Sequence, residues 1–176
     1  LYGRTVADAA SLPVSGAFPG QKIYLEDVDA LAWWDAKTTA WQGYERSYTP
    51  TIAGTSAATV TLATYVIDEH ETVTVSFLIT LTAAMTSQFL LNTPSGVNMH
   101  ANEYITVAHT FVGTAQLWDN SGTARQAAFV APVDADTVAF YYNSAAATMS
   151  SPSTGTTPWT WATADSIGGK FRYRRA

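Results

Sequence analysis

The chain has 176 residues, of which 47% are hydrophobic and 13% are charged. This length predicts one domain, with or without a small appendage. The six Trp, nine Tyr and seven Phe argue against disorder. There is no cysteine, which excludes disulfide bonds, thiolate zinc sites and cysteine nucleophiles. The net charge of −5 argues against a nucleic-acid partner, and no apolar run is long enough for a membrane helix, so we expect no membrane insertion. Leu1 is not an initiator methionine, so we expect a processed chain or a piece of a longer one.

Residues 1–45 predict an N-terminal linker followed by a small β-meander. The segment 7–20 contains two prolines and two glycines and predicts an irregular lead-in. Three short strands are predicted at 21–26, 31–35 and 39–42. A three-stranded patch of this size is marginal in water, and no helix is predicted to cover it. We therefore expect it to bury its large side chains against the following domain, against identical chains, or both: Ile23, Tyr24, Leu31, Trp33, Trp34 and Trp41.

This need for cover is the sequence argument for an oligomer, and it makes Trp33, Trp34 and Trp41 candidate interface residues. Two further candidates come from the second part of the chain. Leu78 breaks the polar face of a predicted strand, so it is either a stray exposed leucine or a contact with something apolar. His109 shares an apolar face, where it is either a hydrogen-bonded core residue or one of three copies near a symmetry axis whose protonation would oppose assembly.

Residues 46–176 predict an antiparallel β-sandwich of the jelly-roll type. The clearest strand is 72–81, whose odd positions are apolar and whose even positions are mostly Thr or Ser; this period of two is typical of a half-buried strand. Similar runs separated by turn clusters predict an all-β fold. They lie at 59–67, 87–91, 103–112, 114–118, 125–130, 137–142, 159–162 and 170–174.

Several of these residues, in this order, resemble bacteriophage tail-fibre and baseplate proteins. The resemblance in the first part is to a linker module with a Leu-Pro, Pro-Gly-Gln-x-Ile-Tyr and Trp-rich hairpin pattern, although the glycine usual after the hairpin aspartate is Ala36 here. The later residues resemble the opening and closing strands of the terminal β-sandwich of the same proteins. The matching segments are 12–13, 16, 19–24, 27, 31–35, 40–41, 48–51 and 158–167.

The resemblance implies a virion protein: a homotrimeric fibre or baseplate tip. In such proteins the N-terminal end joins other virion proteins and the C-terminal domain meets the host surface. The function that we predict from it is non-enzymatic attachment to a host cell-surface glycan, with three weak sites acting together through avidity.

The charged turns carry no convincing catalytic or metal signal. Glu69 and Glu71 flank His70, and Asp134 and Asp136 flank one alanine; both groups are typical of solvated hairpin ends. The three histidines have no spacing that would place two imidazoles on one face. We therefore predict no enzyme activity, no cofactor and no metal.

Aromatic residues next to Asp or Asn at strand ends predict where a sugar would bind. An aromatic ring can stack on a sugar ring while amide and carboxylate groups bond its hydroxyls. The candidates are Trp118, Asp119, Asn120, Tyr141 and Asn143, whereas Tyr142, Trp159 and Trp161 are expected in the core.

The end of the chain alternates cations with aromatic residues over 170–174. We interpret this run as a last strand whose outward charges discourage edge pairing. A patch for anionic wall polymers is the less favoured alternative, because three arginines do not offset the net charge.

Two other functions remain open from the sequence. One is a structural decoration or fibre cap that binds no receptor. The other is the carbohydrate-binding module of a secreted protein, which should be monomeric.

Overall fold

Strands and turns make up the regular structure of the chain in a computed structural model that describes residues 4–15, 17–103, 111–145, 148–150 and 158–176. Within those residues there is no α-helix, and only two short 3₁₀ turns occur, η1 (Ala9–Ser11) and η2 (Ala101–Glu103). The predicted all-β class is therefore confirmed. The strands form two separate sheets, and the chain passes from one to the other between Gln42 and Arg46.

The first sheet has four strands and contains the predicted meander. Its order is β1-β2-β3-β4, with β1 parallel to β2 and the other pairs antiparallel. The strand β1 was not predicted. The bounds are β1 (Thr5–Val6), β2 (Lys22–Leu25), β3 (Ala30–Asp35) and β4 (Ala40–Gln42).

The turn between β3 and β4 does not need the glycine that Ala36 replaces. One oxygen of Asp35 accepts a hydrogen bond from the Lys37 N–H at 2.9 Å, and the other accepts one from the Thr38 hydroxyl at 2.6 Å. Asp side chains commonly close turns in this way. The left-handed residue of the turn is Thr39, at φ 49°.

The lead-in covers the meander, so the prediction that this unit lacks internal cover is wrong for part of it. Trp41 is only 6% exposed, and its indole N–H donates to the Pro13 carbonyl at 2.8 Å. Trp34 is half-buried and meets the Trp41 ring edge-on at 5.5 Å. A small separate core results, made of Leu12, Ile23, Leu25, Ala32 and Trp41.

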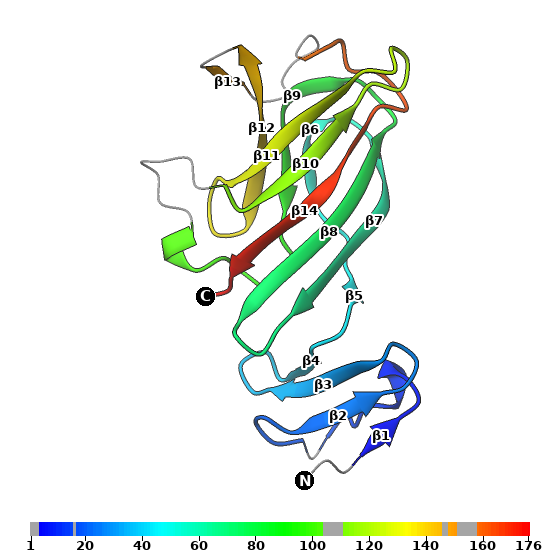
Figure 1. Ribbon diagram of the computed structural model, residues 1–176, viewed down its shortest axis with the longest axis vertical. Coiled ribbons are helices and arrows are strands. Elements are labelled where there is room, and N and C mark those ends of the chain that lie inside the picture. Colours follow the sequence, from blue (N-terminus) through cyan, green and yellow to red (C-terminus); the bar gives the residue numbers. More distant parts are fainter. Residues whose placement is uncertain (1–3, 16, 104–110, 146–147, 151–157) are drawn as a thin grey trace.

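The second sheet has ten strands, and all of its pairs are antiparallel. The order is β5-β7-β8-β14-β10-β11-β12-β9-β6, with β13 pairing β12. Figure 1 shows that this sheet curls, so that β6 and β9 lie behind β10 and β14. The bounds are β5 (Arg46–Ser47), β6 (Ile52–Thr55), β7 (Ala58–Ile67), β8 (Thr72–Leu81), β9 (Met85–Asn92), β10 (Gly113–Trp118), β11 (Arg125–Pro132), β12 (Thr137–Ala145), β13 (Thr148–Ser150) and β14 (Ser166–Arg174).

This curled sheet is sandwich-like, and its concave face encloses the main core. The odd positions of β8 are all 2% exposed or less, as the period of two predicts. Phe77 of β8 lies 5.5 Å from Phe140 of β12 between ring centroids, so the two halves of the curl meet. The other large buried side chains include Phe89, Trp161, Phe171 and Tyr173.

Two strand predictions need correction. Residues 159–162 form no strand, although Trp161 is buried and Trp159 packs against the core as expected. The last strand, β14, is not at an edge: it lies between β8 and β10 in the centre of the sheet. Its outward charges therefore do not serve to discourage edge pairing. The predicted strand at 103–112 falls mostly outside the described residues.

Candidate functional site

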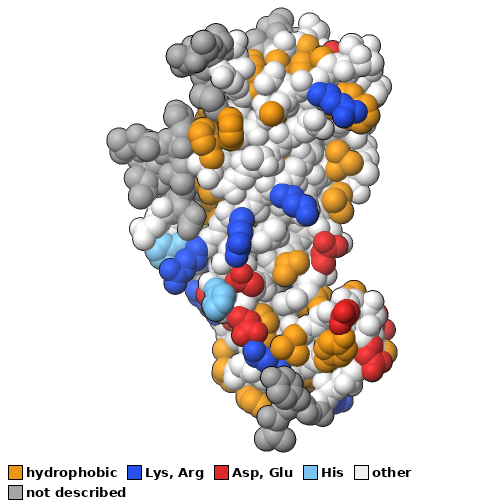
Figure 2. Space-filling model, viewed as in Figure 1, with side chains coloured by type: hydrophobic (Ala, Val, Ile, Leu, Met, Phe, Trp, Pro, Cys, Tyr) orange, Lys and Arg blue, Asp and Glu red, His pale blue; other side chains and the backbone are white. Residues whose placement is uncertain are grey.

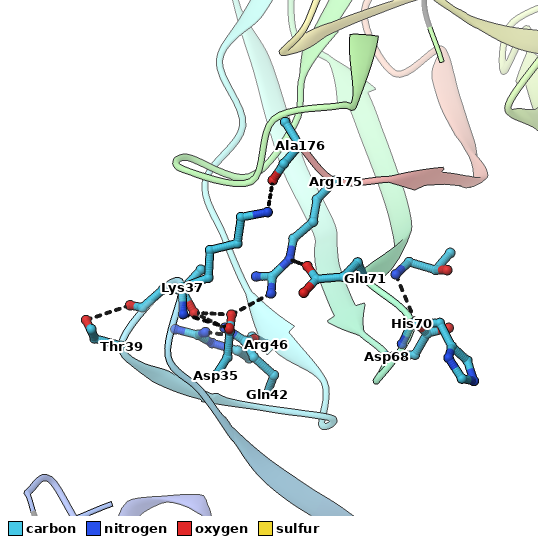
Figure 3. A network of polar contacts seen from close by, with 12 residues as sticks. Asp35, Lys37, Thr39, Gln42, Arg46, Asp68, His70, Glu71, Arg175 and Ala176 are labelled. Atoms are coloured by element: carbon cyan, nitrogen blue, oxygen red, sulfur yellow. Dashed lines mark hydrogen bonds and ion pairs between the residues drawn. The ribbon is translucent and has the colours of Figure 1, made fainter. Parts of the chain in front are cut away.

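A network of buried charges joins the two sheets (Figure 3). The Arg175 side chain is 2% exposed and lies between Asp35 of β3 and Glu71 of the β7–β8 turn. Its Nη2 atom is 2.6 Å from Asp35 Oδ2, and its Nε–H donates to Glu71 Oε2. The Arg175 backbone N–H donates to the Glu71 carbonyl at 2.9 Å. Arg175 is thus held by both sheets at once.

Backbone and apolar contacts reinforce the same joint. The Gly43 N–H donates to the Ile67 carbonyl at 3.1 Å. Gly43 has a φ of 94°, and a Cβ atom there would lie 2.5 Å from the Leu31 carbonyl oxygen, so both its conformation and its space favour glycine. Trp33 of β3 packs against the core of the second sheet. In Figure 1 the first sheet accordingly lies beyond the β7–β8 turn.

The electrostatics of this joint indicate a structural role. Burial acts to raise the pKa of Asp35, but the Thr38 hydroxyl, the Lys37 N–H and the Arg175 guanidinium together hold it below its usual value. Burial acts in the opposite sense on Arg175, yet Glu71 and Asp35 hold its pKa above the usual value. A general acid or base works best with a pKa near the working pH. Both shifts move the pKa further from neutral pH, so Asp35 and Arg175 both stay charged. The pair is therefore suited to holding the two sheets together and not to transferring protons.

A different surface, the outward face of the second sheet, presents groups suited to binding. The outward positions of β8, β14, β10, β11 and β12 carry no Asp or Glu over their described residues. Figure 2 shows this face, with Lys and Arg side chains in a row along the course of β14. Most of the remaining outward side chains are uncharged: Thr72, Thr74, Ser76, Leu78, Thr80, Thr114, Gln116, Ala127 and Asn143.

Strand register brings an aromatic pair and a lysine into one row on this face. Lys170 pairs with Thr114, Thr114 pairs with Phe129, and Phe129 pairs with Tyr141. Phe129 is 39% exposed, and its ring lies 4.8 Å from that of Phe111, which is 42% exposed. We call Lys170, Thr114, Phe129, Tyr141 and Phe111 the aromatic row. Of these residues the sequence predicted only Tyr141 as a site residue. The signal for Phe129 was the alternation of β11, which places it on the same face as the exposed Arg125.

The second aromatic position is Trp118, at the end of β10. Its ring is 40% exposed, and the Arg125 guanidinium lies 5.0 Å from the ring centroid. Trp118 pairs with Arg125, which lies four residues from Phe129 on β11, or ~13 Å along a strand. The predicted sugar-binding residues therefore fall into two groups on one face, and Trp118 and Tyr141 are not brought together.

Asp119 lies in the β10–β11 turn, where its carboxylate is engaged in hydrogen bonds within the turn. Only 8% of it is exposed. Its Oδ1 atom accepts hydrogen bonds from the Gly122 N–H at 2.7 Å and from the Ser121 hydroxyl at 2.8 Å, and these bonds lower its pKa. The carboxylate thus closes the β10–β11 turn. Asn120 is exposed at the tip of that turn, and Asn143 is exposed on β12.

Asp165 determines the conformation of the Trp-rich segment near the end of the chain. It is fully buried, and its two oxygens accept the Asn120 N–H at 2.9 Å and the Ala162 N–H at 2.8 Å. The carboxylate therefore ties this segment to the β10–β11 turn. Ala164, at φ 77°, completes the bend in place of the predicted strand.

The predicted interface residues have different surroundings from one another. Trp41 is buried within its own chain, so its side chain cannot serve a contact between chains without rearrangement. Trp33 and Trp34 are half-buried in contacts within the chain. Leu78, 36% exposed, pairs with Leu62, which is 43% exposed, so these two form an outward apolar pair. His109 lies outside the described residues.

The acidic turns lie at hairpin ends, as expected, but Glu71 is not simply solvated, because it pairs with the buried Arg175. Glu69 pairs with Lys22 at 2.7 Å, and Asp134 accepts the Asp136 N–H at 3.0 Å. Among the described residues there is no group of three or more His, Cys, Asp or Glu that could hold a metal ion. In the same part of the chain no helix has the length and apolarity needed to cross a membrane.

Comparison of the chain with models of known protein families, with curated proteins and with solved structures finds no match. The resemblance to phage tail proteins therefore stays a prediction, and functional arguments depend on the surface itself.

Arg175→Met tests the joint by leaving the Asp35 carboxylate buried without its counter-charge. Breaking one side of a buried pair costs about 3–5 kcal/mol, so urea unfolding should show a loss of that size. Because the two groups are in contact, Arg175→Met and Asp35→Asn should be coupled by about 1–3 kcal/mol in a double-mutant cycle. Lys22→Gln, which removes an exposed ion pair, is the control and should cost less than about 1 kcal/mol. Additive effects of the two joint variants would contradict the account.

Acid provides a second test of the joint, because the sign of its effect follows from the lowered pKa of Asp35. The stability that this carboxylate supplies is complete above the ordinary Asp pKa and is lost as the pH falls through the lower folded-state pKa. Below about pH 4, the free energy of unfolding should fall more steeply for the wild-type chain than for Asp35→Asn. Urea unfolding at successive pH values measures both slopes, and equal slopes would refute the role given to Asp35.

Proposed function

We propose that the chain attaches a phage particle to a host cell by binding a surface glycan, without enzymatic action, as the tip of a tail fibre or baseplate. The glycan binds on the outward face of the second sheet. The observation that carries this proposal is the exposed Phe111–Phe129 pair with Tyr141 in register beside it. Large aromatic side chains grouped on a surface mark binding sites more often than single exposed ones do.

The chemistry of the face supports a sugar ligand. A ring such as Phe129 offers an apolar face of the size of a sugar ring, and nearby hydroxyl and amide groups can bond the sugar hydroxyls. Thr114 and Gln116 of β10 supply such groups next to the aromatic row. Glycosidases use a pair of carboxylates at the cleaved bond, and the described outward positions of these five strands carry none. The face is therefore suited to holding a glycan, and we propose no cleavage.

The rest of the fold supports presentation on a larger particle. The Arg175 joint fixes the second sheet to the small N-terminal sheet, and that sheet would join other virion proteins. Its β2 and β3 strands leave Tyr24 and Leu31 exposed as a cross-strand pair. Three such chains around one axis would present three glycan sites together, and avidity would raise the overall affinity without tight binding at any one of them.

Phe129→Ala tests the glycan site, with Tyr141→Ala as a second variant. Phe129 is exposed and Tyr141 is half-buried on the outward face, so we expect folding to be retained and glycan affinity to fall about tenfold, equivalent to about 1.4 kcal/mol. Binding of the purified chain to a glycan array and to cells that carry its preferred glycan measures the effect. Thr59→Ala, at an exposed position of β7 away from the aromatic row and from β14, is the matched control. Trp118→Ala shows whether the second aromatic position contributes. Unchanged binding in all three aromatic variants would overturn the proposed site and favour a structural cap.

The trimer is tested by sedimentation of the purified chain at micromolar concentration. We expect the mass of three chains. Leu78→Glu places a charge in the outward pair with Leu62, away from the aromatic row across β14, and should shift the mass towards one chain, since burying an unpaired charge is costly. Thr74→Glu adds the same charge on the same face and should leave the mass unchanged. A monomeric wild-type chain would contradict the fibre assignment and favour a secreted carbohydrate-binding module.

A further inference from the structure

Three cations project from the same side of the central strand β14. Lys170, Arg172 and Arg174 are exposed, while the intervening Phe171 and Tyr173 are at most 2% exposed in the core. Alternate residues of a strand are ~6.7 Å apart, so the three charges form a straight, regular row. Because β14 has a paired strand on each side, the row runs along the middle of the sheet, as Figure 2 shows. We call these three residues the cationic row.

The neighbours of the cationic row are mostly uncharged. On β8 they are Ser76, Thr74 and Thr72, paired in that order with the three cations. Arg172 has one partner, Asp68, whose Oδ2 lies 3.3 Å from its Nη2. Lys170 and Arg174 form no ion pair with any residue in the described parts of the chain. Two of the three charges are therefore available to an external anion.

The cationic row has no evident role in stability. The strand is held by its buried aromatic side chains and by two antiparallel neighbours, and the outward positions contribute little to either. Like charges ~6.7 Å apart on one strand repel one another weakly in water, and Asp68 offsets only the middle charge, that of Arg172. The row therefore differs in sign from the net charge of −5 of the whole chain. An anionic ligand would compensate the two outer charges.

We propose that the cationic row binds a linear anionic glycan, a sugar chain that bears phosphate or carboxylate groups at intervals. This rests on the proposed function, because it specifies the glycan that the same face binds. Lys170 belongs both to the cationic row and to the aromatic row, and it lies two strands from Phe129, or ~9.6 Å. A sugar ring on Phe129 and an anionic group at Lys170 can therefore belong to one ligand, whose next anionic groups follow β14 towards Arg174.

A glycan fits this surface better than a nucleic acid does. Nucleic-acid binding domains are usually strongly basic as a whole, whereas this chain is acidic. The acidic β7–β8 turn lies at one end of the cationic row, and its Asp68 already pairs with Arg172. Two unpaired cations suit a ligand with few charges, spaced along a sugar chain, better than a long, densely charged strand.

The test measures binding of the full chain to two anionic polymers, poly(glycerol phosphate) and polygalacturonate, with neutral dextran as the uncharged probe. The two anionic probes distinguish phosphate from carboxylate as the recognised group. We expect at least one of them to bind. Its affinity should fall as the salt concentration rises from 50 to 200 mM, because at ~0.1 M salt surface charges are screened over about 10 Å. Lys170→Gln with Arg174→Gln should abolish most of this affinity and reduce the slope of log affinity against log salt by roughly two.

Two further variants sharpen the result. Arg125→Gln removes a cation from the same face but outside the cationic row, and it should change the affinity less than about twofold, a difference of roughly 0.4 kcal/mol. Asp68→Asn removes the carboxylate that competes for Arg172 and keeps an oxygen that can accept the His70 and Thr72 N–H bonds. We expect it to raise the affinity. An equal loss of log affinity per removed charge in the Arg125 variant and the row variant would overturn the proposal, because binding would then follow total charge.

The remaining outcomes separate this inference from the proposed function. Failure of both anionic polymers to bind overturns the inference, and so does tighter, row-dependent binding of an oligodeoxythymidylate. If adsorption to cells needs Phe129 but not Lys170 and Arg174, the inference fails while the attachment function stands. If the row variant loses the polymers while adsorption depends on neither group, the anionic site stands and the attachment function fails.

Discussion

The Arg175 side chain is the contact on which the arrangement of the two sheets depends. A buried guanidinium is costly to remove from water unless nearby charges and hydrogen bonds compensate it. Here the compensation comes from Asp35 and Glu71, which lie 140 and 104 positions earlier in the sequence and belong to different sheets. Neither sheet alone can satisfy Arg175. The charge therefore favours the joined state over any arrangement in which the sheets separate or slide.

This constraint matters because the surface that we assign to binding lies on only one of the two sheets. The meander has a small core of its own, so it could behave as a loosely tethered appendage. Gly43 and Trp33 oppose this through a backbone hydrogen bond and apolar packing at the same joint. A fixed angle between the sheets gives every copy of the chain the same presentation of its outward face. Avidity requires that geometry, because sites that cannot engage together gain nothing from being linked.

The sequence predicted well what depends on local alternation. The strand at 72–81 has the bounds that its period of two indicates, and the alternation around Phe171 correctly separates buried aromatics from exposed cations. The sequence pattern could not place β14 in the centre of the sheet, because strand order depends on pairing between distant segments. The cover of Trp41 by the lead-in was missed for the same reason, since the contact with Pro13 spans 28 residues.

Residue type alone did not show which side chains are engaged in local hydrogen bonds. Asp119 has the side chain of a sugar ligand, but the glycine three positions later supplies an N–H that the carboxylate accepts within the turn. Trp159 and Trp161 alternate as in a strand, yet Asp165 accepts the Ala162 N–H and bends the chain there. In both cases a short-range partner determined the outcome. An Asp followed by glycine or by a small residue at a bend is a detectable signal of this kind.

Net charge says little about the outward face of the second sheet, because it averages over surfaces of different composition. The acidic residues that make the chain negative lie in turns and at the joint, where Asp35, Glu69 and Glu71 each have a basic partner. On the outward face of the second sheet, the cations have fewer ion-pair partners than the acidic residues of the joint have. Strand alternation enforces this division, since β14 can direct Phe171 and Tyr173 inward only by directing its cations outward. The pattern that builds the core therefore also fixes the position of the cationic row, and a ligand that follows β14 meets charges at a spacing set by the backbone.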